Sequence, residues 1–357
     1  MTTDVDEPAG QASPGGPQPP AGPAGPAGGR SGLSRIFNAR VAEASLLPFA
    51  FVLVIAGFGI ARPDTFFQWS NFTSIFGLNA VELVLVMALL IPLTNGDLDL
   101  SVAELSGMTA VLVGWLNVNH GWAIVPAILV ALAVGVLCGA INGFIIVKFD
   151  VNPFIVTLAT GSVFDGIALW LPNQLTIAGI SPNLTSWVLL RHILGIPLDF
   201  WYGIVLMLIM FYVLTFTPFG QRALFVGQSR EVARLSGFKV SSTRFWAFVL
   251  AGFIAAISGV INAGVLGSAT PGNQGTLLLS VYAAAFLGFT TIQPGRFNAI
   301  GAGLSVFFLA VAVNGMNLIG AQTYVQQLFY GVFLVLAVVL SRIINRRRAA
   351  AAAQATT

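Results

Sequence analysis

The stretch from Trp122 to Val147 reads WAIVPAILVALAVGVLCGAINGFIIV and contains no charged side chain. A helix of this length crosses the roughly 30 Å hydrocarbon core of a bilayer, because each residue advances about 1.5 Å. The chain is 56% hydrophobic and 8% charged, whereas soluble domains carry roughly 25% charged residues. Too few polar residues remain to cover a water-soluble fold, so we expect an all-α membrane protein.

Similar apolar runs recur along the chain and predict ten transmembrane helices. They are expected at residues 45–61, 72–93, 101–117, 122–147, 154–171, 201–217, 245–266, 277–291, 297–314 and 322–341. The stretch 172–200 is long for a loop. We expect a short interfacial helix within it, around Trp187 to Leu190.

The distribution of Lys and Arg tests this count. With the N-terminus inside, fourteen of the sixteen cations fall on the cytoplasmic side, and only Arg62 and Arg191 fall outside. Positive charge on the inside fixes membrane orientation during insertion. An odd number of helices would place either the N-terminal arginines or the Arg346–Arg348 cluster outside. Both termini are therefore predicted to be cytoplasmic.

Three segments follow from this pattern. Residues 1–40 begin with a Pro-, Gly- and Ala-rich stretch that cannot repay its ordering entropy, so we expect a disordered cytoplasmic tail. Residues 41–345 form the transmembrane domain, and residues 346–357 form a basic, Ala-rich C-terminal tail.

The sequence gives no sign of a metal site, an ATP-binding site or a catalytic site in this chain. Cys138 is the single cysteine, and His120 and His192 lack metal-ligand spacing, so we expect no metal site. The two lysines, Lys148 and Lys239, do not follow glycine, so there is no Gly-Lys-Ser/Thr loop for ATP. No catalytic constellation is present, and the cations are too dispersed to indicate nucleic acid. We expect a non-catalytic chain without a cofactor.

Carboxylates are concentrated in one short stretch, Thr94 to Glu104, which reads TNGDLDLSVAE. Ser101 and Glu104 have the spacing of a capping box, which predicts that a helix begins there. Asp97 and Asp99 have no cation near them in the sequence. Carboxylates at membrane depth are costly and often line an aqueous path, so the two either line a substrate path or shape a turn.

The loop 218–243 is the longest polar segment on the predicted cytoplasmic side. Its middle predicts a short amphipathic helix with Val232 and Leu235 on one face and charged residues on the other. Such a helix either docks on a partner or lies on lipid. The candidate coupling residues are Gly227, Arg230, Glu231, Val232, Arg234, Leu235, Ser236 and Gly237.

Three glycines, Gly135, Gly139 and Gly143, recur every four residues in the fourth predicted helix. Small residues at this spacing allow two helices in lipid to approach closely. They pack the helix either against another helix of the chain or against a second copy.

Four motifs carry a family resemblance. Gly96 to Ala103 resembles the Gly-Gly-Ile-Asp-Leu-Ser-Val-Gly signature of ribose-type ABC sugar importer permeases, and Gly227 to Gly237 resembles their coupling segment. Asn142-Gly143 followed by Pro153 to Thr160, and Asn314 to Gly320, resemble two further family motifs. The resemblance covers about residues 40–345.

The resemblance implies the permease subunit of an ATP-driven importer in the bacterial plasma membrane. It implies a second permease copy, identical or paralogous, an ATPase subunit that holds ATP and Mg, and an extracytoplasmic binding protein that delivers a small sugar. This chain departs from the pattern at Asp97 and Ala103, and at Leu278 and Ser280, where many relatives carry acidic residues. The departures concern the substrate more than the class of transport.

Alternatives remain at this point. A branched-chain amino acid or nucleoside permease belongs to the same superfamily. An ion-coupled secondary transporter would need intramembrane carboxylates, and a passive channel would need neither these nor a docking helix. The candidate residues for a substrate path are Asn79, Glu82, Asp97, Asp99, Asp165, Asn314 and Asn317.

Overall fold

The computed structural model describes residues 29–272 and 274–354, with side chains for 44–272 and 274–343. Most of the expected N-terminal tail therefore lies outside the described residues. Residues 1–39 and 40–357 form two separate units, and the second holds the helical assembly. The helices are α1 (Gly29–Ala61), α2 (Pro63–Phe66), α3 (Trp69–Leu78), α4 (Ala80–Thr94), α5 (Val102–Gly114), α6 (Ile124–Lys148), α7 (Pro153–Trp170), α8 (Pro182–Thr185), α9 (Leu198–Phe216), α10 (Pro218–Gln228), α11 (Arg230–Leu235), α12 (Val240–Leu266), α13 (Gly275–Phe289), α14 (Ala299–Leu318) and α15 (Thr323–Gln354).

Each of the ten predicted helices overlaps a helix of the structure, and the all-α class is confirmed. Within the described residues, eight helical segments are long and apolar enough to cross a membrane. The helices α5 and α13 are shorter, with 13 and 15 residues. The second predicted helix is interrupted at Asn79, which ends α3 and precedes α4.

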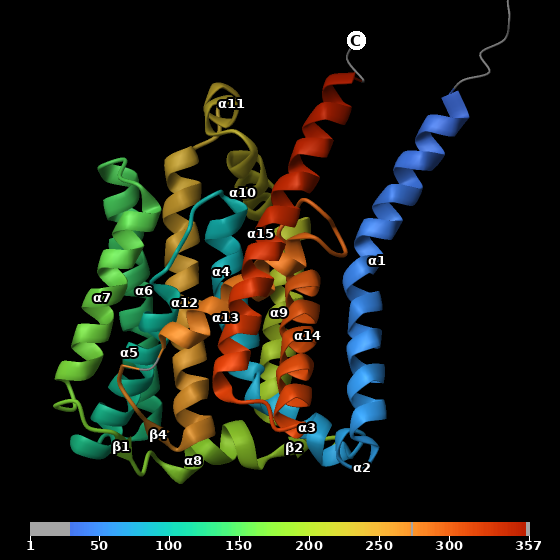
Figure 1. The fold of residues 1–357 in the computed structure, drawn as a ribbon. Coiled ribbons are helices and arrows are strands. Elements are labelled where there is room, and N and C mark those ends of the chain that lie inside the picture. Colours follow the sequence, from blue (N-terminus) through green and yellow to red (C-terminus); the bar gives the residue numbers. More distant parts are fainter. Residues whose placement is uncertain (1–28, 273, 355–357) are drawn as a thin grey trace, which may run out of the picture. The chain divides into compact units, whose positions relative to one another are not determined.

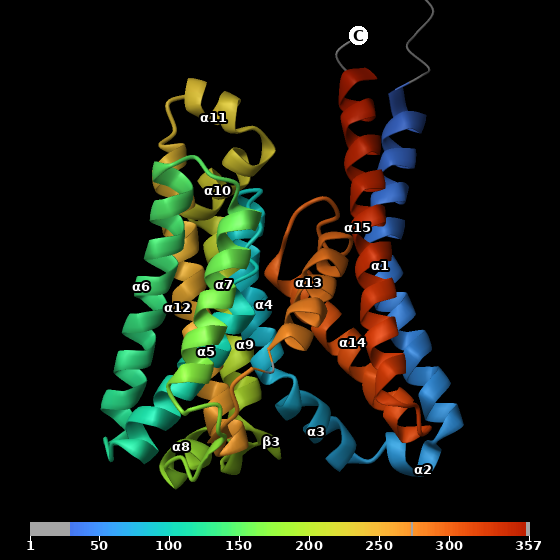
Figure 2. The ribbon, with the colours of Figure 1, turned by 60° about the vertical axis from the view of Figure 1, so that its left-hand side comes forward.

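Helix α4 forms the centre of the fold, because all fifteen of its residues are buried. It contacts α12, α9, α13 and α14. Two views agree that α5, α6, α7 and α12 lie on one side of α4 and α14 on the other, and Figure 2 places α13 and α15 on the side of α14 (Figures 1 and 2).

The helices α6 and α12 form the most extensive helix contact in the described chain. Gly135, Gly139 and Gly143 all face α12, where added side chains would meet the backbone or side chains of Gly252, Phe248 and Phe245. The glycine stripe therefore packs two helices of the same chain together, which is the first of the two alternatives drawn from the sequence.

Short irregular segments close one end of the helices. The π-helical turn η1 (Trp115–Asn119) follows α5, and η2 (Ser186–Leu190) extends α8, so Trp187 to Leu190 is helical as expected. The strands β1 (Ile177–Ala178) and β4 (Ser268–Ala269) pair antiparallel, with Ile177 opposite Ala269. The strands β2 (His192–Ile193) and β3 (Ile196–Pro197) form a second antiparallel pair.

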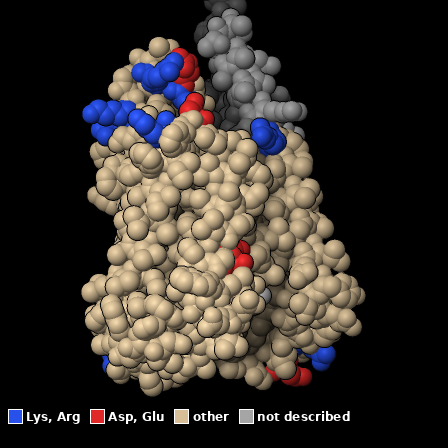
Figure 3. Space-filling view, turned by 90° about the vertical axis from the view of Figure 1, so that its left-hand side faces the viewer, with Lys and Arg blue, Asp and Glu red and all other residues tan. Residues whose placement is uncertain are grey.

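Charged side chains gather at the opposite end. On the face shown in Figure 3, Lys and Arg cluster at the end that carries α11, above a belt with few charges. This is the end that the cation distribution predicts to be cytoplasmic. The prediction of ten spans with both termini cytoplasmic stays a prediction.

Candidate functional site

A cavity of about 620 Å³ lies between α4, α12, α13 and α15. Asn79 and Glu82 line it, and both were predicted from the sequence to lie on a substrate path. The other polar residues of its lining are Asn262, Thr276, Ser280, Thr323, Gln326, Gln327 and Tyr330. We call it the outer cavity, because it lies near Asn79 and Thr323, at the end remote from α11 (Figure 2).

Among the residues that the structure describes, Glu82 is the one acidic residue in this lining. It is 6% exposed, and its Oε1 atom has no hydrogen-bond partner among the described residues. Leaving a buried polar atom unpaired is costly, so the site favours a ligand that donates a hydrogen bond. Asn317 is exposed and does not line this cavity, but its Oδ1 accepts a hydrogen bond from Nε2 of the lining residue Gln326.

A second cavity of about 750 Å³ shares Gly275 and Leu279 with the outer cavity. We call it the inner cavity. It is lined mainly by apolar residues, among them Leu98, Leu100, Phe286 and Phe289, and it reaches Arg342 in α15. The two cavities therefore adjoin along α13, with the polar outer cavity at its start and the apolar inner cavity extending toward its end.

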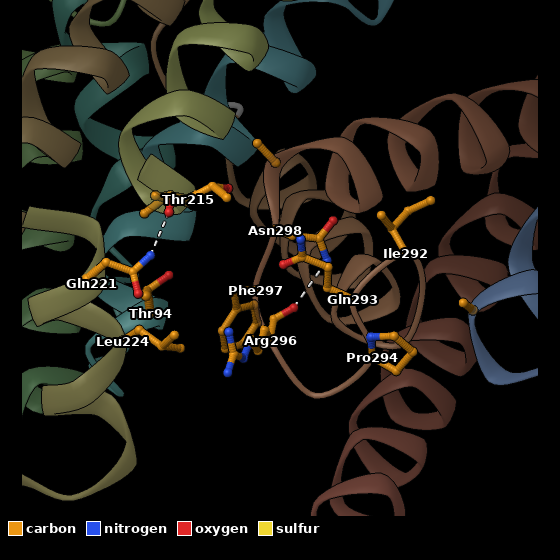
Figure 4. Close-up of a pocket in the computed structure, with 13 residues that line it drawn as sticks. Thr94, Thr215, Gln221, Leu224, Ile292, Gln293, Pro294, Arg296, Phe297 and Asn298 are labelled. Atoms are coloured by element: carbon orange, nitrogen blue, oxygen red, sulfur yellow. Dashed lines mark hydrogen bonds between the residues drawn. The ribbon is translucent and has the colours of Figure 1, made fainter. Parts of the chain in front are cut away.

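A third cavity, of about 490 Å³, lies between α9, α10 and the turn from α13 to α14 (Figure 4). Its polar lining is tied to the backbone: Gln221 donates to Thr215 O at 2.6 Å, and Asn298 donates to Arg296 O at 3.2 Å. None of the residues predicted for the site lines it. We assign it no role.

Asp97 does not line either of the first two cavities. Its side chain is fully buried, and Arg244 donates to it twice, from Nε at 2.8 Å and from Nη2 at 3.0 Å. Arg230 Nη2 donates to Asp97 Oδ1 as well. The acidic residue that lacks a cation near it in the sequence is therefore bound by two arginines, which favours a structural role for Asp97 over a place on the substrate path.

Asp99 and Ser101 shape the start of α5. Asp99 Oδ1 accepts from the backbone N–H of Ser101 at 3.0 Å and from its hydroxyl at 2.6 Å, and Asn142 donates to the same hydroxyl at 2.9 Å. The helix begins after Ser101 as expected, but the predicted capping box is absent because no side-chain cap forms. Ser101 bonds Asp99 and Asn142 instead, which favours the turn over the substrate path for Asp99.

Two other candidates lie away from the cavities. Asp165 is half-buried in α7, and Asn314 is half-buried in α14. Neither lines the outer or the inner cavity. The structure thus brings Asn79 and Glu82 to one cavity, connects Asn317 to it through Gln326, and leaves the other four candidates outside both cavities.

The predicted coupling segment folds into α10 and α11. Val232 is 51% exposed and Leu235 is 78% exposed, so an apolar face points away from the chain. Ser229 caps the start of α11, because its hydroxyl oxygen accepts a hydrogen bond from the backbone N–H of Val232 at 3.3 Å. The helix ends at Leu235, and Gly237 follows the C-cap residue Ser236 with φ +82°. Glu231 and Arg234 form an exposed ion pair at 2.8 Å. Arg230 differs from them, because it turns inward to Asp97.

Comparison with known proteins identifies the family of the chain. The family model described as branched-chain amino acid transport system, permease component, matches residues 65–338. The chain is 31% identical to a ribose import permease protein of Bacillus subtilis, over 82% of this chain and 90% of that protein. It is 29% identical to a probable ABC transporter permease protein of Sinorhizobium fredii, over 90% and 94%. It is 26% identical to a D-allose transport system permease protein of Escherichia coli, over 84% and 91%. No solved structure matches the chain.

Proposed function

Given that this chain belongs to the family of branched-chain amino acid transport system permease components, we propose that it imports a monosaccharide or similar polyol. Members of this family are non-catalytic, multi-pass subunits of ABC transporters in the bacterial inner membrane. The observation that carries the proposal is the outer cavity, where Glu82 and a set of amide and hydroxyl groups meet inside an apolar helix assembly.

The chemistry of the outer cavity fits a neutral polyol. Sugar hydroxyls both donate and accept hydrogen bonds, and Glu82, Asn262 and Gln327 offer groups of both kinds. Relatives named as ribose and D-allose permeases support this substrate class. A branched-chain amino acid carries a carboxylate that requires a cation or a helix N-terminus. Among the described residues that line the outer cavity there is no Lys or Arg, but the first turns of α4, α13 and α15 lie in its lining. The preference for a polyol over an amino acid therefore rests on the relatives named as ribose and D-allose permeases.

The proposed transport cycle combines the two cavities of this chain with three partner proteins. A binding protein delivers the substrate to the outer cavity, and a second permease copy, identical or paralogous, completes the path. An ATPase subunit binds the exposed face of α11, and ATP-driven closure of the ATPase pair opens the outer and inner cavities in turn. Carbohydrate leaves through the apolar inner cavity, whose walls do not hold hydroxyl groups tightly.

Uptake of radiolabelled ribose and D-allose tests the proposal. Glu82→Gln keeps the shape of the side chain and removes its charge, so we expect uptake to fall while the protein amount in the membrane stays unchanged. Asp165→Asn, in α7, is the matched control and should transport normally. Equal uptake by the Glu82→Gln variant and the unsubstituted chain would contradict the assignment of the outer cavity.

A further inference from the structure

The turn between α4 and α5 lies against the segment proposed to dock on the ATPase. Gly96 follows the end of α4 with φ +76°, and the N–H groups of Gly96 and Asp97 return to Leu93 O and Pro92 O, both at 3.0 Å. These two bonds fix the direction in which the chain leaves the helix. The residues after this turn reach α5 without helical structure.

Backbone atoms of α10 touch this turn directly. A side chain on Gly227 would overlap the carbonyl oxygen of Thr94 and crowd Asn95. Asn95 is completely buried. The last turn of α10 and the last turn of α4 therefore meet without intervening side chains, so one cannot shift far without displacing the other.

Asp97 adds a second connection, and it is electrostatic. It accepts hydrogen bonds from Arg230 in α11 and from Arg244 at the start of α12. Arg244 is 6% exposed in its side chain, whereas Arg230 is 44% exposed. Buried ion pairs hold their geometry because separation would leave an unpaired charge away from water. Arg244 anchors Asp97 to the membrane-spanning α12, and Arg230 connects it to the docking helix.

The extended residues after Gly96 have two faces. Successive side chains of an extended chain point in opposite directions. Leu98 and Leu100 line the inner cavity together with Gly96. Asp97 and Asp99 are buried on the other face, where they bind Arg230 and Arg244, and Ser101, respectively. One short segment thus carries the cavity wall on one side and the connection to α11 on the other.

We propose that the Arg230–Asp97 ion pair is the mechanical link that carries movement of the ATPase-docked helix α11 to the wall of the inner cavity. Arg230 and Asp97 are positioning residues, since neither lines the outer or the inner cavity. The inference rests on the proposed function, because it needs an ATPase bound to α11. It also gives a role to Asp97, which stands where the family signature has glycine.

Cysteine labelling of the cavity wall tests the link. In a Cys138→Ser background, Leu98→Cys reports on the inner cavity in the permease purified with its ATPase. The rate of labelling by a thiol reagent is compared without nucleotide and with ATP plus vanadate. We expect the two rates to differ in this background, and the difference to disappear when Arg230→Gln is added. Arg230→Lys, which keeps the cation, should restore it.

The controls separate the link from the docking of the ATPase. Arg222→Gln removes an exposed cation of α10 and should preserve the nucleotide-dependent change. The ratio of ATPase to permease should be the same in every variant. The inference is overturned if Arg230→Gln keeps the nucleotide-dependent change, or if the rate at position 98 never depends on nucleotide. Failure of the unsubstituted chain to co-purify any ATPase would instead reject the proposed function.

Discussion

Arg244 in α12 donates two hydrogen bonds to Asp97, although 147 residues separate the two in the sequence. Both side chains are almost completely buried. A planar guanidinium that meets a carboxylate in this way gives charge-assisted bonds with defined geometry. The turn after α4 is thereby fixed to the start of α12.

Asp97→Asn should destabilise the protein, because it leaves the buried Arg244 with only the exposed Asp150, 4.0 Å away, as a counter-charge. Breaking a buried pair from one side costs roughly 3–5 kcal/mol. We expect a clear drop in the thermal unfolding temperature in detergent. The double variant Asp97→Asn with Arg244→Met removes both buried charges and should recover most of the loss. A double variant as unstable as the single one would show that the pair is not the source of stability.

Gly139→Ala should weaken the contact between α6 and α12. A Cβ atom at position 139 would overlap the carbonyl oxygen of Phe248, and overpacking of this kind costs about 1–3 kcal/mol. Gly166→Ala in α7 is the matched control, because a Cβ atom there meets nothing within 4 Å. The first variant should unfold at a lower temperature and the second should not. Equal unfolding temperatures would refute the packing role.

Labelling of single cysteines tests the orientation. Lys239 directly precedes α12. Asn119 ends η1, which contacts the strand β1. Because β1 pairs with β4, which follows the C-terminal end of α12, Lys239 and Asn119 lie at opposite ends of this helix. In a Cys138→Ser background, a membrane-impermeant reagent applied to intact cells should label Asn119→Cys and leave Lys239→Cys unlabelled. The reverse pattern would remove the cytoplasmic assignment of α11.

The sequence predicted the helices well because each apolar run is long enough to be recognised by itself. It also named Glu82 as a candidate for the substrate path, since a carboxylate within an apolar run has few structural explanations, and this stays a prediction. It missed the break at Asn79, although Gly77 stands two residues before it, and it gave Ser101 a capping partner that the structure does not use. The competing partners of Ser101 are Asp99 and Asn142, and Asn142 comes from a different helix.

The partners of Asp97 could not be predicted, for a related reason. Its two partners, Arg230 and Arg244, come 133 and 147 residues later in the chain, and no local pattern pairs residues over such distances. Arg244 was not a candidate at all, because a cation at the cytoplasmic end of a helix is what membrane topology alone demands. Only the packing of α11 and α12 against the turn reveals the cluster.

The central claim is that α11 receives the ATPase, and Leu235 tests it most directly. Leu235 is 78% exposed at the end of α11, so Leu235→Asp should leave folding and insertion intact. An apolar anchor of this kind carries about 2 kcal/mol or more of binding free energy, which exceeds a tenfold change in affinity. We expect the variant to lose its ATPase during purification in detergent and to import no sugar, whereas Arg234→Ala, beside it, should do less. If the Leu235→Asp variant still co-purifies a stoichiometric ATPase and imports normally, the account is wrong.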